Sequence, residues 1–230
     1  MATLFTLVSS VKRLISRTGI PSDDIRASNR FIADLIRKYN NKNIELRTDF
    51  GKDATLLEQV GIDLGCLSLC TVDPSECPTL LWGCKAKKVC DEVPKILSLP
   101  DFRGVLYLGI IDKGIFTGES FKYVNPANLQ IKRKTASFGL FSYWTYIGGE
   151  YWVIPAKKYV DIEVIGMRIV ADNPIDANPN INPDMDIAGC ETDYPMLSGG
   201  EAEVVGFVLN ELGYSMQLPD DERNNARDDR

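Results

Sequence analysis

The sequence of 230 residues predicts an α+β fold, in which helices at both ends of the chain flank a central antiparallel β barrel or sandwich. Three observations predict it. Apolar residues recur at three- and four-residue spacing near the N-terminus, which is the period of a helix. From about residue 60 the period changes to two, as in strands. Finally, Gly148-Gly149 separates two runs rich in aromatic and β-branched residues, which is a strong signal for a tight β-hairpin.

Two helices are expected in residues 1–48. The first ends where Thr18-Gly19 breaks its apolar stripe. The second begins at residues 21–24, where short polar side chains can cap free backbone amides, and ends at residues 40–43. Its polar surface is basic. The two apolar stripes are Leu4, Leu7, Val8, Val11, Leu14 and Ile15, then Phe31, Ile32, Leu35 and Ile36; the basic residues are Arg26, Arg30, Arg37 and Lys38.

Residues 49–171 are expected to form the β domain, with short connections between antiparallel strands. The continuous apolar run of residues 105–111 predicts a buried strand. Three other segments alternate and predict half-solvated strands. Their shared faces are Leu64, Cys66, Ser68, Cys70 and Val72; Leu129, Ile131 and Arg133, alternating with Lys132 and Lys134; and Val160, Ile162 and Val164, opposite Asp161 and Glu163.

The hairpin at residues 142–155 is the strongest local prediction. A two-residue turn places Tyr146 opposite Tyr151, Thr145 opposite Trp152 and Trp144 opposite Val153. Both of its faces then carry large apolar groups, so both are expected to be covered. We interpret the hairpin as a packing device, with the domain core on one face and a neighbouring subunit on the other.

Residues 172–230 are expected to hold a long loop, one amphipathic helix and a charged tail. Asn-Pro and Tyr-Pro pairs prevent regular structure over residues 172–197. The helix begins at residues 198–201, which have the capping-box spacing, and Gly213 closes it. The tail from Pro219 onward is expected to be disordered without a partner. The helix stripe is Val204, Val205, Val208, Leu209 and Leu212.

The composition disfavours an enzyme and a membrane protein. The chain has no histidine, the commonest general base and metal ligand, so no Ser-His or Cys-His pair exists. No apolar run reaches the roughly 18 residues of a membrane helix. The N-terminus has no basic residue before its apolar part, which argues against a secretory signal. We therefore expect a soluble protein made in a cytoplasm.

The net charge of −6 is distributed unevenly. Residues 1–48 carry a net charge of +5, residues 49–171 are neutral, and residues 172–230 carry −11. Such a chain can offer one end to an acidic partner and the other to a basic partner. A solvated helix face followed by an acidic tail would give the same pattern.

Five of the six cysteines fall between residues 66 and 90, and three states are open to them. Four thiolates could bind structural zinc, two could form a disulfide, or all could remain reduced and partly buried. Zinc sites favour pairs two to four residues apart, and only Cys66 and Cys70 come near that spacing. Reduced thiols are therefore the favoured interpretation. The five are Cys66, Cys70, Cys77, Cys84 and Cys90.

The remaining charged groups do not assemble into a convincing site. Asp161 and Glu163 match the paired acids of a glycosidase, but alternating acids are usual on any solvated sheet face. Asp184 and Asp186 lack the glycine-turned loop and closing acid of a calcium site. Two basic clusters could contact phosphate, yet the protein as a whole is acidic. They are Lys85, Lys87 and Lys88 near Trp82, and Lys132, Arg133 and Lys134 near Phe138. We therefore assign no catalytic, cofactor-binding or metal-binding residues.

Several short sequence motifs occur in the same order as in a known protein family. Asp63-Leu-Gly-Cys66, Val72-Asp73, Cys77 and Gly83-Cys84 open the β region. The hairpin and a strand leading to Asn173-Pro174 follow, and Tyr194-Pro195 precedes a single terminal helix with an Asp/Asn-rich end. From about residue 22 to its C-terminus the chain resembles the neck (head-to-tail) ring proteins of crAss-like tailed bacteriophages.

The resemblance implies a virion structural protein without catalysis or cofactors. Such proteins form rings below the portal, as adaptor, stopper or tail-completion layers, and double-stranded DNA passes through them without sequence-specific binding. The implied partners are copies of the chain itself, about twelve to a ring that continues the portal's symmetry, with the portal and adjacent neck or tail rings. The alternative is a carbohydrate- or protein-binding β module, such as a phage fibre or capsid accessory protein, with Trp144 and Trp152 as a stacking platform.

Overall fold

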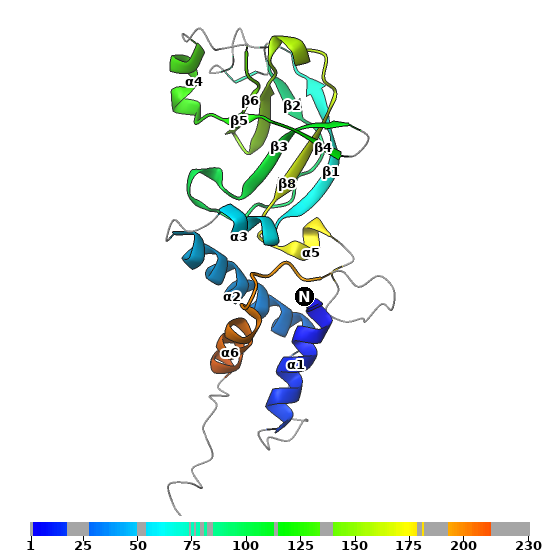
Figure 1. Ribbon diagram of the computed structural model, residues 1–230, viewed down its shortest axis with the longest axis vertical. Coiled ribbons are helices and arrows are strands. Elements are labelled where there is room, and N and C mark those ends of the chain that lie inside the picture. Colours follow the sequence, from blue (N-terminus) through cyan, green and yellow to red (C-terminus); the bar gives the residue numbers. More distant parts are fainter. Residues whose placement is uncertain are drawn as a thin grey trace, which may run out of the picture. The chain divides into compact units, whose positions relative to one another are not determined.

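The computed structural model describes residues 2–17, 28–49, 54–73, 85–112, 115–133, 140–178 and 193–212, together with residues 75, 77, 78, 81 and 181 (Figure 1). The chain divides into two compact units. One, called here the barrel unit, is Val60–Ala177, and the other, called the helical unit, combines Met1–Gln59 with Asn178–Arg230.

The described part of the barrel unit holds an eight-stranded sheet with short helices between strands. The strands are β1 (Ile62–Thr71), β2 (Lys87–Val89), β3 (Val105–Asp112), β4 (Ile115–Ser120), β5 (Lys122–Tyr123), β6 (Tyr143–Ile147), β7 (Glu150–Ile154) and β8 (Val164–Ile169). The α-helices are α4 (Pro126–Arg133) and α5 (Pro174–Ala177), and the 3₁₀ turns are η3 (Pro100–Phe102) and η4 (Lys157–Tyr159).

The sheet curls back on itself, in the order β4-β3-β8-β1-β2-β7-β6-β5 (Figure 1). Its two end strands, β4 and β5, are successive pieces of one chain segment and are separated only by Phe121. The Phe121 amide donates to Leu108 on β3, whereas the next amide, of Lys122, donates to Ser142 beside β6. The α+β prediction with a β barrel is therefore confirmed as a half-barrel, in which the pair β5–β6 is parallel and the other pairs are antiparallel.

A β-bulge in β1 changes which side chains face the core. Gly65 adopts a φ of 73°, and the register with β8 shifts between Asp63 and Cys66. The extra residue reverses the alternation, so Leu64 and Leu67 both pack on the core while Cys66 is exposed. The prediction that Leu64 shares a face with Cys66 is therefore wrong, because a strict period of two does not survive a bulge.

The hairpin has the predicted register, and its own unit covers both faces. Tyr146 pairs with Tyr151, Thr145 with Trp152 and Trp144 with Val153. Gly148 and Gly149 have φ values of 65° and 89°, as a primed turn requires. Trp144 and Val153 belong to the core inside the half-barrel, which is formed by Leu67, Leu69, Val89, Leu108, Phe121, Trp144, Val153, Ile165, Met167, Ile169 and Ala171. On the other face, Trp152 packs in a second cluster with Leu81, Val124, Leu129, Tyr143 and Ile154.

Two predicted strands of the β domain have other structures. Residues 126–133 form α4, because Asn125 caps the helix by accepting from the Ala127 amide at 3.0 Å, and Pro126 suits the first helical position. Leu129 of this helix is fully buried. Residues 159–163 lie in η4 and the connection after it, so Asp161 and Glu163 do not share a strand face, and β8 begins only at Val164.

The described helices of the helical unit are α1 (Leu4–Arg17), α2 (Asn29–Asp49), α3 (Ala54–Gln59) and α6 (Glu201–Glu211). The α1 prediction is confirmed, and Val11 and Ile15 of its stripe are completely buried. α2 does not end at residues 40–43, because Asn40 and Asn43 are buried and donate to the Pro195 carbonyl and the Glu203 carboxylate. The expected start of this helix at residues 21–24 lies outside the described residues.

The terminal helix is confirmed, but its capping box is not. Gly200 is the N-cap of α6 and no side chain caps the helix. The Ser198 amide donates instead to the Gln59 side chain at 3.2 Å. Gly213 and the charged tail lie outside the described residues.

Polar contacts hold α6 against α2. The Lys38 ammonium and the Tyr39 hydroxyl both donate to Glu211, and Arg47 pairs with Glu203 at 2.9 Å. The Tyr39 ring also stacks on Phe207, with ring centroids 5.4 Å apart. The hydrogen bonds from Lys38 and then Tyr39 lower the pKa of Glu211, because they stabilise its charged form.

The Glu211 contact predicts an acid-sensitive contribution to stability. Because its pKa is lower in the folded state, the carboxylate stabilises the fold above its ordinary pKa of 4.5, and this contribution disappears as the pH falls through the folded-state pKa. Thermal unfolding of the wild type and Glu211→Gln should therefore differ at pH 7 and converge below the folded-state pKa. Glu45→Gln, at an exposed position on α2, is the control. A difference that persists undiminished in acid would contradict this assignment.

Burial of both hairpin tryptophans predicts large losses of monomer stability. Trp144 and Trp152 are 4% and 2% exposed, so Trp144→Ala and Trp152→Ala should each lower the free energy of unfolding by about 3–5 kcal/mol. Urea unfolding followed by far-UV circular dichroism measures this without relying on indole fluorescence. Ile115→Ala, at an exposed site of the same unit, should change it by less than about 0.5 kcal/mol. Full monomer stability in either tryptophan variant would refute the packing described here.

Candidate functional site

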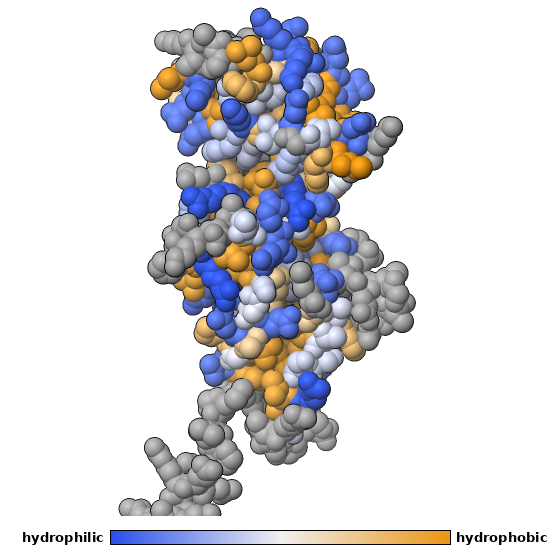
Figure 2. Space-filling model, in the orientation of Figure 1, coloured by the Kyte–Doolittle hydropathy of each residue, from blue (hydrophilic) through white to orange (hydrophobic). Residues whose placement is uncertain are grey.

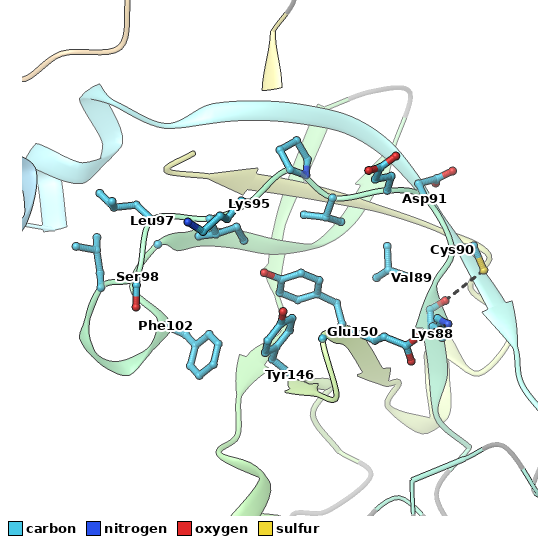
Figure 3. A pocket seen from close by; sticks show the side chains of 18 residues that line it. Lys88, Val89, Cys90, Asp91, Lys95, Leu97, Ser98, Phe102, Tyr146 and Glu150 are labelled. Carbon is cyan, nitrogen blue, oxygen red and sulfur yellow. Dashed lines mark hydrogen bonds and ion pairs between the residues drawn. The ribbon is translucent and has the colours of Figure 1, made fainter. Parts of the chain in front are cut away.

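A groove of about 670 Å³ opens on the barrel unit beside the tip of the hairpin (Figure 3). One wall is the segment of residues 88–99, which leaves β2 and crosses the barrel without forming a long strand. The other wall is the hairpin, through Tyr146 and residues 149–151. Phe102, at the end of η3, lies beside Tyr146. We call this hollow the aromatic groove.

Aromatic rings form the floor of the groove and continue into the barrel core. The rings of Tyr146 and Tyr151 lie 4.7 Å apart, and Phe102 lies 5.7 Å from Tyr146. Beneath them, Trp144 lies 6.1 Å from Tyr151 and 6.2 Å from Phe102. The groove therefore extends the aromatic face of the hairpin to the surface.

Phe102 is held in an unusual backbone conformation. Its φ of 56° is in the left-handed region, which costs free energy for a residue with a bulky side chain. Its ring packs against Tyr123 at 4.8 Å as well as Tyr146, yet 37% of the residue remains exposed. These contacts keep an exposed aromatic face at the mouth of the groove.

The charges along the groove leave it acidic. Lys88 pairs with Glu150, and Lys95 pairs with Asp172 at 2.8 Å, so the cations of this wall are matched. The Asp91 carboxylate accepts a hydrogen bond from the Ser68 amide, and the adjacent Glu92 is exposed. Asp91 and Glu92 therefore supply negative charge that the described residues do not neutralise through a salt bridge.

Two tyrosine hydroxyls add neutral polar groups. Burial raises the pKa of Tyr151, so its hydroxyl stays protonated at neutral pH. Among the described residues, neither this hydroxyl nor that of Tyr146 has a hydrogen-bond partner in the protein. Aromatic faces next to carboxylates and unpartnered hydroxyls favour a cationic ligand, because cations are attracted to both ring faces and acids.

A second hollow of about 310 Å³ lies beside η4 and is less suited to a charged ligand. Tyr159 and Lys158 both donate to Glu119 and lower the pKa of this carboxyl. Lys122 lies over the Phe141 ring, 3.9 Å from its centroid. Because these charges already have partners, the hollow offers mainly the apolar side chains of Leu140 and Phe141, which are 67% and 45% exposed.

The structure removes the basis for two predicted functions of the hairpin. Trp144 and Trp152 are buried in separate clusters of their own unit, so they form no stacking platform for a sugar. The same burial leaves neither tryptophan exposed to a neighbouring subunit, so only the tip of the hairpin, with Tyr146 and Tyr151, remains partly exposed. The predicted cross-strand pairs do locate Tyr146 and Tyr151 on one face, but no sequence signal identifies Phe102 or the wall of residues 88–99.

The cysteines do not all remain reduced. Cys70 and Cys90 form a disulfide between diagonal neighbours on β1 and at the end of β2, with Cα atoms 5.9 Å apart. Cys66 is a free exposed thiol, and burial raises the pKa of the half-buried Cys77. The preference for reduced thiols is therefore wrong for one pair, because antiparallel pairing brings together two residues 20 positions apart. Cys84 lies outside the described residues.

The other predicted charged sites are not brought together. Lys87 is nearly buried and donates to the Ile162 carbonyl at 2.6 Å, so it is unavailable to phosphate. Lys88 pairs with Glu150, and Lys132 lies on α4. Within the described ranges, no group of three or more acidic or cysteine residues could hold a metal ion. Trp82, Lys134, Phe138, Asp184 and Asp186 lie outside these ranges.

Comparison with known proteins identifies one family. The model of a family described as phage tail ring protein 2 matches residues 6–230. No curated protein matches the chain. In addition, none of the described helices is both long enough and apolar enough to cross a membrane.

The disulfide predicts a redox-dependent stability. Removing the cross-link with Cys70→Ser should lower the free energy of unfolding by about 3 kcal/mol without reductant, because the unfolded chain regains the freedom of a loop between residues 20 positions apart. With dithiothreitol the wild type should lose the same advantage. Urea unfolding in both conditions measures this. Cys66→Ser is the control and should have no such effect; equal behaviour of the two variants would contradict the pairing.

Proposed function

Because the chain belongs to the phage tail ring protein 2 family, we propose that its copies close a ring in the neck between the portal and the tail, through which double-stranded DNA passes. Membership makes the chain a structural protein of the virion that associates with itself and with neighbouring tail proteins. This proposal rests on the match of the family model to residues 6–230.

The surface of each unit supports an assembly role. On the face drawn in Figure 2, hydrophobic patches lie among hydrophilic ones. Large apolar side chains are exposed although both units have well-buried cores, so each unit keeps apolar surface that another chain could cover. In the barrel unit they are Phe102, Ile115, Ile131, Leu140, Phe141 and Val164, and in the helical unit Phe31, Leu46 and Phe207.

The finer parts of the proposal are a ring of about twelve copies, contact with the portal and an adjacent ring, and synthesis in the host cytoplasm before assembly. A head-to-tail contact between identical chains closes into a ring when its rotation divides the circle evenly. We propose no catalytic step and no cofactor for this protein.

The acidic C-terminal region suits a channel for DNA. With a net charge of −11, residues 172–230 repel phosphate, so a lumen that they line would let DNA slide instead of gripping it. Docking of the same residues on a basic neighbouring ring would also use this charge. Both arrangements make Asp220, Asp221 and Glu222 important for particle assembly or DNA retention.

Electron microscopy of virions tests the proposed position. Averaged images should place density for this chain in a closed ring on the portal axis, with about twelve subunits. Charge reversal at Asp220, Asp221 and Glu222 should reduce infectivity and the fraction of DNA-filled particles. A ring at another position in the tail would leave the family assignment intact but refute the neck position, and wild-type infectivity of the variant would refute the role of the acidic residues.

A further inference from the structure

We propose that the aromatic groove of one subunit receives the exposed side chains of Leu140 and Phe141 from the next copy. Together with Lys122, which lies over the Phe141 ring, these residues are called here the apolar knob. The proposal rests on the self-association expected of a ring protein and names the surfaces that perform it. Both surfaces belong to the barrel unit and share no residue, so the contact is head-to-tail.

The groove and the knob lie at opposite ends of the same hairpin. The groove is lined by Tyr146 and residues 149–151, at the turn. The knob lies at the open end, where Leu140 and Phe141 precede β6 and line the second hollow with Ala156, which follows β7. A contact between these two ends joins successive barrel units end to end. Repeating the same rotation from each copy to the next then continues the contact around a ring.

The knob carries apolar surface of the kind that an aromatic groove buries. Leu140 and Phe141 are consecutive in the chain and both are exposed. On the groove side, Phe102 is exposed, and Tyr146 and Tyr151 are partly exposed. Contacts of an aliphatic side chain and a ring with other rings are typical of the buried centre of a protein interface. Packing the knob into the groove therefore removes apolar side chains of both subunits from water.

The charges of the two surfaces are complementary. Lys122 is exposed and forms no ion pair with the described residues, because its neighbour is the uncharged Phe141 ring, 3.9 Å from the ammonium. The groove contributes the exposed Glu92, which has no ion pair in the described ranges either, and the neighbouring Asp91. Insertion of Phe141 would bring Lys122 to these carboxylates without breaking its contact with the ring. Such charge matching selects the partner and its orientation.

The knob also stands on a firm support. Ser142, directly after Phe141, is buried, and its hydroxyl accepts a hydrogen bond from the Ala156 amide at 3.0 Å. The Ser142 carbonyl accepts another from the Lys122 amide, also at 3.0 Å. These bonds fix the backbone on which both parts of the knob are carried. Little ordering is therefore needed when the knob enters the groove of another subunit.

The other exposed aliphatic side chains of the barrel unit are less suitable occupants. Ile115 pairs across the sheet with Asp112, and Val164 follows the exposed Glu163, so an acidic groove would repel both surfaces. Ile131 lies on α4, where the adjacent base already has a partner in the chain. The knob is thus the described surface of this unit that joins exposed apolar side chains to a base without an acidic partner.

A mixing experiment with the full chain tests the head-to-tail contact. The groove variant is Glu92→Lys and the knob variant is Leu140→Asp, and both positions are exposed. Sedimentation velocity should show concentration-dependent association of the wild type and at least about tenfold weaker association of each variant alone, as expected for a central contact. An equimolar mixture should form dimers and nothing larger, because only one intact groove and one intact knob can meet.

A charge exchange and matched controls complete the test. Glu92→Lys combined with Lys122→Glu in one chain should recover association relative to either single variant. Glu163→Lys and Ile115→Asp introduce the same charged side chains at exposed sites of the barrel unit outside the groove and the knob, and should associate like the wild type. Circular dichroism melting curves check that every variant is folded.

Three results would overturn the proposal. They are a wild type that stays monomeric up to about 1 mM, unchanged association of the folded groove or knob variant, and a mixture that behaves as the average of its components. Virion images separate this failure from failure of the ring itself. A neck ring that forms normally with Glu92→Lys chains would refute the groove contact alone, whereas its absence from wild-type virions would refute the proposed function.

Discussion

Burial of the aromatic hairpin on both faces is the constraint on which the barrel unit depends. Trp144 packs inside the half-barrel. Trp152 lies on the opposite face of the hairpin and packs against α4 in the cluster that contains Leu129. A hairpin with one solvent-exposed face could pack against only one of these two clusters. The two-residue glycine turn fixes the register, and the register decides which tryptophan enters which cluster.

The same face of the hairpin connects the core with the surface. Trp144 and Val153 lie inside the half-barrel, and the next pair on that face, Tyr146 and Tyr151, lies in the groove. The groove is therefore a continuation of the core beyond the end of the barrel. Tyr146 and Tyr151 are partly buried and pack on that core, so few side chains would have to be ordered when a ligand binds.

The parts of the fold that could be predicted are those in which one local pattern decides the structure. The hairpin register, the α1 stripe and the existence of strand β3 follow from short-range turn chemistry and periodicity, although β3 is only partly buried. The errors occur where one residue overrides a pattern. Gly65 reverses the alternation in β1, and Asn125 caps a helix where alternating apolar and basic residues predict a strand.

Only one wall of the candidate site could be predicted from the sequence, because the two walls come from different segments of the chain. Tyr146 and Tyr151 come from the hairpin and share a predictable face. Phe102 and the acidic wall arrive from a segment whose position is set by isolated contacts, such as the bridge between Ile96 and Ala171 and the Ser68–Asp91 hydrogen bond. Those contacts depend on the completed sheet. The groove is thus a product of the closed barrel, and it cannot exist before the hairpin has packed.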